Sequence, residues 1–246
     1  MKYKDDLIME FEETFNLIVN SEAFLKYSEM KLELNIKEYS MLIKEDINDL
    51  IALINSYNHN SIVDIGCGTG DLIAYISKKI KGKCTGVDIS KKIIEHLNKS
   101  KSSNLQYVVG DIEIGVEELY DIVICVDVLY FVENFESAIN NLINITNSNG
   151  KCIIYYSDHQ LLKNGEPIIE RYLKSMNIEY NVTDITEHEK KSWESSINAI
   201  EHLYLDFKNE GLEEFALMMK NEAIDCLAKN IEFSTKRFRY IIKKSG

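Results

Sequence analysis

The sequence of 246 residues is poor in features that would mark several classes of protein. Its five cysteines lack the paired spacing of a metal site, and it has a single proline, Pro167. Acidic residues outnumber basic ones by 40 to 28, and the resulting formal charge of −12 disfavours RNA or DNA as a partner. With no apolar signal core and no apolar run long enough to span a bilayer, we expect a cytoplasmic protein that binds no membrane.

What the sequence does contain is one stretch around which the rest is organised, residues 61–71, which reads SIVDIGCGTGD. The apolar run that ends in Asp64 predicts a buried strand. The glycines Gly66, Gly68 and Gly70 allow positive φ angles and let the backbone approach a ligand without an intervening Cβ. A helix that begins directly after them would aim its free N–H groups at the same ligand. The stretch therefore predicts a nucleotide-type binding loop.

The spacing of the glycines distinguishes between nucleotides. A dinucleotide-binding loop would read G-x-G-x-x-G, whereas this loop reads G-x-G-x-G and has Asp71 where the last glycine is required. The run D-x-G-x-G-x-G resembles the first motif of class I S-adenosylmethionine (SAM) dependent methyltransferases. The resemblance covers residues 61–160 firmly and implies SAM as cofactor and S-adenosylhomocysteine (SAH) as product. The loop residues that it assigns to the cofactor are Asp64, Gly66, Cys67, Gly68 and Gly70.

A second predicted strand, 83–88, also ends in an acid. Asp88 stands about 20 residues beyond the glycine loop, where a carboxylate can accept both ribose hydroxyls, and Ile89 follows it at the cofactor. The alternative is that Asp88 caps the next helix, although Ser90 could cap that helix unaided.

A third strand, 105–112, closes on Gly110 and Asp111. In the resembling family such a carboxylate accepts from the exocyclic amine of adenine, and the backbone N–H of the next residue, here Ile112, meets the ring. The alternative is a turn-forming aspartate. For Asp64 two roles stay open, because it either fixes the N–H groups of the loop or meets the ammonium of the cofactor.

The remaining periodicity, together with the resemblance, predicts an α/β fold with a Rossmann-like, seven-stranded, mostly parallel sheet and helices on both faces. Further strands are expected at 120–127, 151–157, 178–185 and 237–242, and helices at 5–26, 36–57, 135–145 and 166–176. We expect a single domain, with an N-terminal helical cap (1–60), a SAM-binding core (61–185 and 234–246) and a helical substrate lid (186–233).

Methyl transfer from a sulfonium is an in-line displacement, so the protein mainly has to hold the acceptor against the methyl carbon, and no metal is needed. The fourth strand is apolar on both faces, and residues 125–130 at its end are expected to line the crevice, with Cys125 at the cofactor. If a base is needed, His159 at the end of the fifth strand is the candidate, with Asp127 and Tyr130 as rivals. The alternative for His159 is a solvent-facing loop residue.

Candidate substrate-binding residues lie in the N-terminal helices and in the insertion. Tyr27 and Tyr39 are expected over the site, unless they simply pack. The run 184–186, Asp-Ile-Thr, followed by Trp193, resembles a pattern of methyltransferases that act on small molecules, and His188 lies between the two. The alternative is a packing or dimerisation extension.

The leading interpretation is a SAM-dependent methyltransferase, monomeric or homodimeric, that acts on nitrogen or oxygen of a small molecule. A protein or RNA methyltransferase is the first alternative. A SAM-binding module without chemistry, in which side chains would fill the crevice, is the second. An NAD-dependent oxidoreductase is disfavoured by the missing third glycine.

Overall fold

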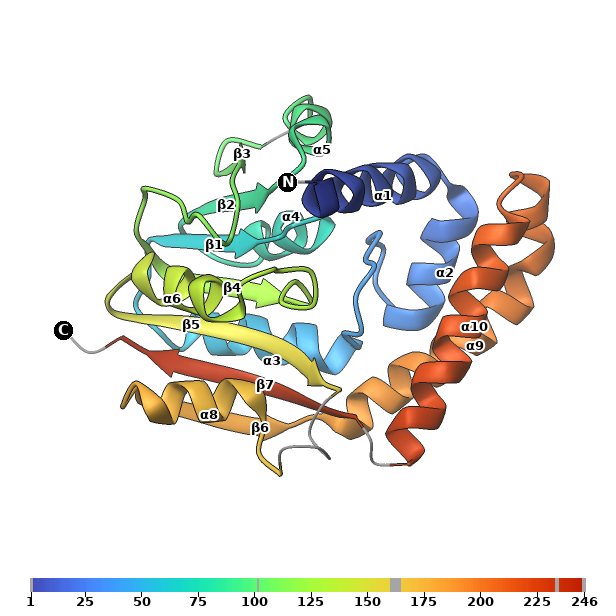
Figure 1. Cartoon of the computed structure of the whole chain (residues 1–246). Helices are drawn as coiled ribbons and strands as arrows, with labels where there is room; N and C mark the ends of the chain where they lie inside the picture. Colours follow the sequence, from blue (N-terminus) through green and yellow to red (C-terminus); the bar gives the residue numbers. More distant parts are fainter. Residues whose placement is uncertain (1, 101, 160–164, 233–234, 245–246) are drawn as a thin grey trace.

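The computed structural model describes residues 2–100, 102–159, 165–232 and 235–244, and a seven-stranded sheet forms its centre (Figure 1). The strand order is β3-β2-β1-β4-β5-β7-β6; the first five strands run parallel, and β7 is antiparallel to both of its neighbours. The strands are β1 Ser61–Ile65, β2 Lys83–Asp88, β3 Leu105–Val109, β4 Tyr120–Val126, β5 Thr146–Asp158, β6 Tyr180–Asp184 and β7 Lys236–Lys243. The predicted fold class is confirmed, and the strand order reverses between β1 and β4, where ligands of such sheets bind.

Helices cover both faces of this sheet because the central strands are apolar on both sides. In β4, Ile122 and Ile124 belong to one core with α3 Lys44–Asn55, α4 Asp71–Ser77 and α5 Lys91–Leu97. Val123 and Cys125, which alternate with them, belong to a second core with α6 Phe135–Asn144 and α8 Ile168–Ser175. The period of two in β4 thus places successive side chains in different layers.

A third, separate core lies beyond the carboxyl ends of the parallel strands (Figure 1). It joins α1 Lys2–Ile18 and α2 Glu22–Leu32 to the insertion helices α9 Thr186–Asn209 and α10 Glu213–Ile231. Phe24, Phe207 and Phe215 are buried at its centre. Although α9 has 24 residues, neither it nor any other helix in the described ranges is long and apolar enough to cross a membrane. Phe233, near the end of the predicted lid, lies outside the described residues.

The single helix predicted over 5–26 is wrong, because α1 ends at Ile18 and a second helix, α2, begins after Ser21. The Ser21 side chain caps α2 by accepting from the backbone N–H of Phe24 at 2.9 Å. Its hydroxyl also donates to Glu210, at the corner between α9 and α10, at 2.6 Å. A capping serine thus breaks the apolar periodicity and fastens α2 to the insertion.

The helix predicted over 36–57 is also wrong in its first part, since only Lys44–Asn55 is helical. Residues 33–43, here called the crossing segment, are irregular. They run past the carboxyl ends of the parallel strands, where the glycine loop lies. The Thr69 hydroxyl donates to the Lys37 carbonyl at 2.6 Å, and the Met41 N–H donates to Asp127 at 3.1 Å. The backbone of the crossing segment therefore bonds to loops of the sheet in place of its own helical partners.

Candidate active site

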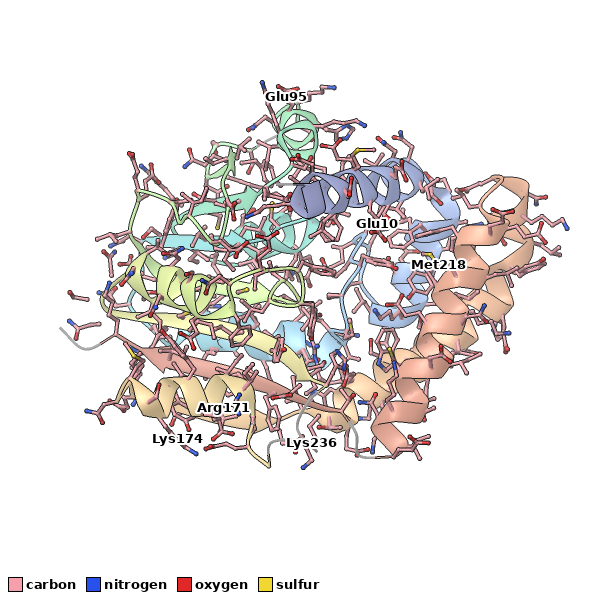
Figure 2. All side chains as sticks on the ribbon, in the orientation of Figure 1. Glu10, Glu95, Arg171, Lys174, Met218 and Lys236 are labelled. Atoms are coloured by element: carbon pink, nitrogen blue, oxygen red, sulfur yellow. The ribbon has the colours of Figure 1, made fainter. Side chains whose placement is uncertain are left out.

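A cavity of about 550 Å³ lies at the carboxyl ends of β1, β2 and β4, beneath α1, α2 and α10. Its volume is within the range of small-molecule and cofactor sites. It is lined by the glycine loop, the ends of β2 and β4, the loop after β3, the crossing segment and Trp193 of α9. Glu10 of α1 and Met218 of α10, both labelled in Figure 2, line it from the helical side. A crevice filled by side chains would have favoured a binding module without chemistry. Side chains do not fill this one.

The glycine loop forms one wall of the cavity. The φ angles of Gly66, Gly68 and Gly70 are +77°, +49° and +75°, so each adopts a conformation that other residues rarely take. A Cβ on Gly66 would lie 2.3 Å from Val128 Cγ2, whereas one on Gly68 would meet no atom within 4 Å. Gly68 therefore offers bare backbone to a ligand in the cavity. Gly70 instead caps α4 and does not line the cavity.

Asp88 is placed as the sequence predicts, at the end of β2 and on the cavity wall, followed by Ile89. Its two carboxylate oxygens accept from the N–H groups of Gly68 at 3.0 Å and Ser90 at 2.9 Å. Burial raises the pKa of this carboxyl group despite these bonds. Ser90, not Asp88, is the N-cap of α5, accepting from Ile93 N–H at 3.2 Å. With three backbone N–H groups bonded to it, the Asp88 carboxylate keeps a lone pair for a ligand hydroxyl.

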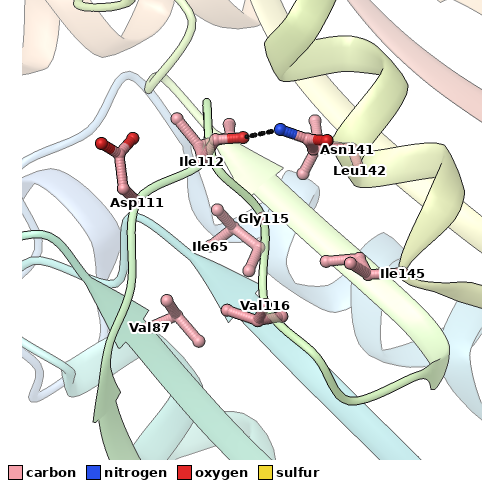
Figure 3. A pocket seen from close by; sticks show the side chains of 9 residues that line it. All are labelled: Ile65, Val87, Asp111, Ile112, Gly115, Val116, Asn141, Leu142 and Ile145. Atoms are coloured by element: carbon pink, nitrogen blue, oxygen red, sulfur yellow. Dashed lines mark hydrogen bonds between the residues drawn. The ribbon is translucent and has the colours of Figure 1, made fainter.

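Asp111 and Ile112 also line the cavity, in the loop after β3. One Asp111 oxygen accepts from the Glu113 N–H at 2.9 Å and the other pairs with Lys4 of α1 at 2.5 Å, so a turn and an ion pair coexist there. Figure 3 shows how α6 holds this loop, with the Asn141 amide donating to the Ile112 carbonyl at 2.9 Å. The loop is thus fixed from both sides, and its adenine-binding role stays a prediction.

Asp64 and Cys125 lie away from the cavity surface. Cys125 points into the core beneath α6, which corrects the expectation that it lines the crevice. Asp64 is 3% exposed, and burial, together with the nearby charges of Glu38 and Asp88, raises its pKa to about 8. Of the two roles left open for Asp64, its position favours supporting the loop from behind over direct contact with a cofactor.

Replacing Asp64 by asparagine is expected to stabilise the protein at alkaline pH. A folded pKa of about 8, above the ordinary value of 3.8, means that the folded state holds a proton that the unfolded state has lost. This carboxyl group therefore reduces stability increasingly as the pH rises from about 4 to about 8. In thermal unfolding, Asp64→Asn should gain about 1 kcal/mol or more at about pH 8.5 and less at about pH 5.5. The exposed Asp6→Asn is the control, and an equal gain at both pH values would contradict the prediction.

Asp127 and Tyr130 line the cavity but belong to a buried network centred on Arg237 of β7. The Arg237 guanidinium is fully buried and donates to both Asp127 oxygens, at 2.6 and 2.9 Å. The Tyr130 hydroxyl donates to Asp127 at 3.2 Å and accepts from the Ser157 N–H at 2.6 Å. Neither residue is placed to take a proton from a methyl acceptor. The Asp127 carboxylate is bound to a guanidinium, and burial raises the pKa of the Tyr130 phenol.

The same network continues into the insertion. The Ser157 hydroxyl accepts from Arg237 at 3.0 Å and donates to Glu189 of α9 at 2.6 Å. The other Glu189 oxygen accepts from the Asn230 amide of α10 at 2.9 Å. Buried polar groups thus fasten both insertion helices to the sheet beside the cavity.

The two histidines proposed from the sequence do not line the cavity. His159 Nδ1 lies 3.1 Å from Thr235 Oγ1, and its ring centre is 5.5 Å from that of Tyr130, which occupies the cavity wall. His188 Nδ1 lies 2.7 Å from an Asp46 oxygen and joins α9 to α3. The expectation that His159 faces the crevice is therefore wrong. Burial also lowers the pKa of its imidazole below the ordinary value.

The aromatic residues proposed for substrate are at the cavity. Tyr27, Tyr39 and Trp193 all line it, from α2, the crossing segment and α9. The Tyr27 hydroxyl is 2.7 Å from Ser196 Oγ, and the buried indole N–H of Trp193 has no hydrogen-bond partner among the described residues. Their placement agrees with the prediction, while their contact with a substrate stays a prediction.

Three charged residues that the sequence did not single out share this end of the cavity: Lys31, Glu38 and Glu222. Lys31 is 8% exposed and donates to the Ser40 carbonyl. Burial lowers the pKa of Lys31 to about 8 and raises that of Glu38 to about 7. We call the space lined by Tyr27, Lys31, Glu38, Tyr39, Trp193 and Glu222 the inner chamber. No sequence signal marked these charges, since Glu38 and Glu222 look like ordinary polar positions of predicted helical segments and Lys31 lies between two such segments.

The fold and the loop geometry define a class of protein. A sheet of this order, with a glycine loop after β1 and an acid at the end of β2, is that of the class I SAM-dependent methyltransferases. The cofactor of that class is SAM, and the described residues fit it: bare backbone at Gly68, a carboxylate with a free lone pair at Asp88, and an open cavity in front of both. Within the described ranges no group of three or more His, Cys, Asp or Glu could hold a metal ion.

Comparison with known proteins agrees with this class. Residues 63–154 match the family described as methyltransferase domain. A ubiquinone biosynthesis O-methyltransferase of Rickettsia typhi is 33% identical over 106 residues, 41% of this chain and 42% of that protein. The chain spans about two fifths of the length of the curated relatives it matches.

Solved structures match over more of the chain. The cyclopropane synthase MmaA2 from Mycobacterium tuberculosis superposes with a TM-score of 0.73 at 13% identity, over 95% of this chain and 98% of that one. A phosphoethanolamine N-methyltransferase 2 of Haemonchus contortus, in complex with SAH and phosphomonomethylethanolamine, gives 0.68 at 16% identity, over 80% and 52%. At such identities the likeness shows the fold alone.

Proposed function

We propose that this protein is a methyltransferase that transfers the methyl group of SAM to nitrogen or oxygen of a small molecule. The observation that carries the proposal is the continuity of one cavity, which reaches from the glycine loop and Asp88 to the inner chamber. A cofactor on the loop and an acceptor in the chamber would share a single space, as an in-line displacement requires.

The chain's own residues would hold the two reactants in place. Gly66, Gly68 and Asp88 would bind the methionine and ribose parts of the cofactor, with Asp111 and Ile112 at the adenine. When bound, SAM supplies an electrophilic methyl group on a sulfonium. The aromatic walls of the inner chamber would exclude water and orient the acceptor.

The position of the inner chamber beneath α2, α9 and α10 favours a small acceptor over a protein or an RNA. The α9–α10 pair and α2 form a common core above it, so we propose that residues 186–232 act as a substrate lid. The formal charge of −12 also disfavours a nucleic-acid partner. Both O-methyltransferases and an N-methyltransferase are among the similar proteins, which supports methyl transfer without distinguishing the acceptor atom.

Calorimetry and a transfer assay test the proposal. SAM and SAH are expected to bind at about micromolar dissociation constants, and NADH is expected not to bind. Incubation with SAM and pools of small amines, phenols, peptides or tRNA should release SAH only with a small-molecule pool. Absence of SAM and SAH binding would disprove the proposal. SAH release with peptides or tRNA alone would show that the methyl acceptor is a peptide or an RNA and not a small molecule.

A further inference from the structure

The charges of the inner chamber are unbalanced. Its lining includes two carboxylates, Glu38 and Glu222, and one ammonium, Lys31. Asp127, another acid of the cavity wall, is neutralised by its two bonds to Arg237. With these groups ionised, the chamber holds one negative charge in excess.

The two carboxylates, Glu38 and Glu222, lie on different sides of the inner chamber. Glu38 lies on the glycine-loop side, where its charge reaches Asp64 and Asp71. Glu222 lies on the opposite side, in α10, where the Tyr39 hydroxyl forms a hydrogen bond to it. The charges of both carboxylates act on Lys31, whose pKa burial lowers to about 8. A molecule in the chamber would meet one acid at the lid and the other near the cofactor.

The walls between these charges are aromatic. Tyr27 is 4% and Trp193 7% exposed, and Tyr39 stacks on Phe215 of α10 with ring centres 6.3 Å apart. Aromatic faces attract ammonium groups, more strongly where water is excluded. An excess negative charge within aromatic walls suits a cation, and it disfavours a carboxylate or a phosphate.

We infer that the methyl acceptor is an amine that enters the inner chamber as its ammonium ion, held by Glu222 and the aromatic walls, and gives a proton to Glu38. This inference rests on the proposed function. The Glu38 carboxylate takes the proton, and the freed nitrogen lone pair forms the bond to the methyl carbon of SAM. The carbon–sulfur bond breaks, its electron pair stays on sulfur as neutral SAH, and the product leaves as a methylated ammonium ion.

The environment of Glu38 suits this step. Burial raises its pKa to about 7, so it exchanges a proton near neutral pH. The titratable groups that face it are Lys31 of α2, Asp64 of β1, Cys67 and Asp71 of the glycine loop and α4, and Asp127 after β4. The charge of Asp71 opposes ionisation of Glu38 until a cation is nearby, whereas Asp127 is paired with Arg237 and Asp64 stays protonated below about pH 8.

Matched probes of one shape and different charge test the inference. Phenethylamine, 2-phenylethanol and 3-phenylpropionate, and the hexyl series of amine, alcohol and carboxylate, are titrated into SAH-saturated protein. An amine of at least one series should bind about tenfold tighter than its alcohol, and the carboxylates should not bind. Glu222→Gln should remove the preference, whereas Glu214→Gln, an exposed acid on the same helix, should leave it unchanged.

The role of Glu38 has a separate readout. For an amine that releases SAH, Glu38→Gln should lower kcat at least about tenfold and remove the rise of kcat with pH near 7, with SAH affinity unchanged. Binding of an alcohol or carboxylate as tight as the amine, or no amine binding in either series, would overturn the inference. An unaltered pH profile in Glu38→Gln would overturn its proton-transfer part. Because SAH binding is measured first, failure of the proposed function is told apart from failure of the inference.

Discussion

An Asp88→Ala protein is expected to bind SAM and SAH about 100-fold more weakly than the unsubstituted chain. The carboxylate is expected to accept from the ribose hydroxyls, and a hydrogen bond to a charged group is worth about 1.5–3 kcal/mol. The substitution also removes the acceptor of the Gly68 N–H, which lies on the cavity wall and orders the loop. Calorimetric titration with SAH measures the loss directly.

The control for this result is Glu95→Ala on α5, an exposed acid labelled in Figure 2 that does not line the cavity. Its SAH affinity should equal that of the unsubstituted protein. Far-ultraviolet circular dichroism of both variants establishes that the sheet is intact. Unchanged SAH affinity in folded Asp88→Ala would remove Asp88 from the cofactor site.

An Arg237→Met protein is expected to lose about 3–5 kcal/mol of folding free energy. Arg237 is fully buried and neutralises Asp127, so its removal leaves a carboxylate on the cavity wall without its guanidinium. The Ser157 hydroxyl loses a donor as well, which weakens the attachment of α9 through Glu189. Urea unfolding, followed by circular dichroism, gives the free energy.

The double variant Asp127→Asn with Arg237→Met separates charge from packing. If the uncompensated carboxylate causes most of the loss, the double variant should be more stable than Arg237→Met alone. Arg171→Met, at an exposed position on α8 labelled in Figure 2, is the control and should change stability by no more than about 0.5 kcal/mol. A double variant less stable than the single one would show that the network contributes mainly by its shape.

The central part of the fold was predictable because its signals are local. Each signal occupies a stretch of about a dozen residues or fewer. The signals are the strand before the glycines, the turn that the glycines form, and the acids at or just after the ends of β2 and β3. The apolar run of β4 also predicted its central position correctly. Parallel order then brings the strand ends together, so the positions of Asp88 and Asp111 beside one cavity could be predicted without any knowledge of contacts, while their roles stay predictions.

The rest depends on contacts between distant parts of the chain. Asp127 and Arg237 are separated by 110 positions, and neither residue shows in its own stretch that it is one half of a buried pair. The crossing segment looked helical because its apolar residues continue the spacing of α3. Its hydrogen bonds instead run to Thr69 and Asp127, which sequence periodicity does not register. The inner chamber was missed for the same reason.

The attachment of α1 has a consequence for turnover. This helix covers the part of the cavity beside the glycine loop and is held at its rim by Lys4 on Asp111, by Glu12 on Ser90, and by Phe11 against Phe131. The first two contacts are polar, whereas Phe15 near the other end of α1 is buried in the core with α4 and α5, so displacement would begin at the Lys4 end. We expect spent cofactor to leave by displacement of this helix, at a rate that increases with ionic strength as its ion pairs are screened.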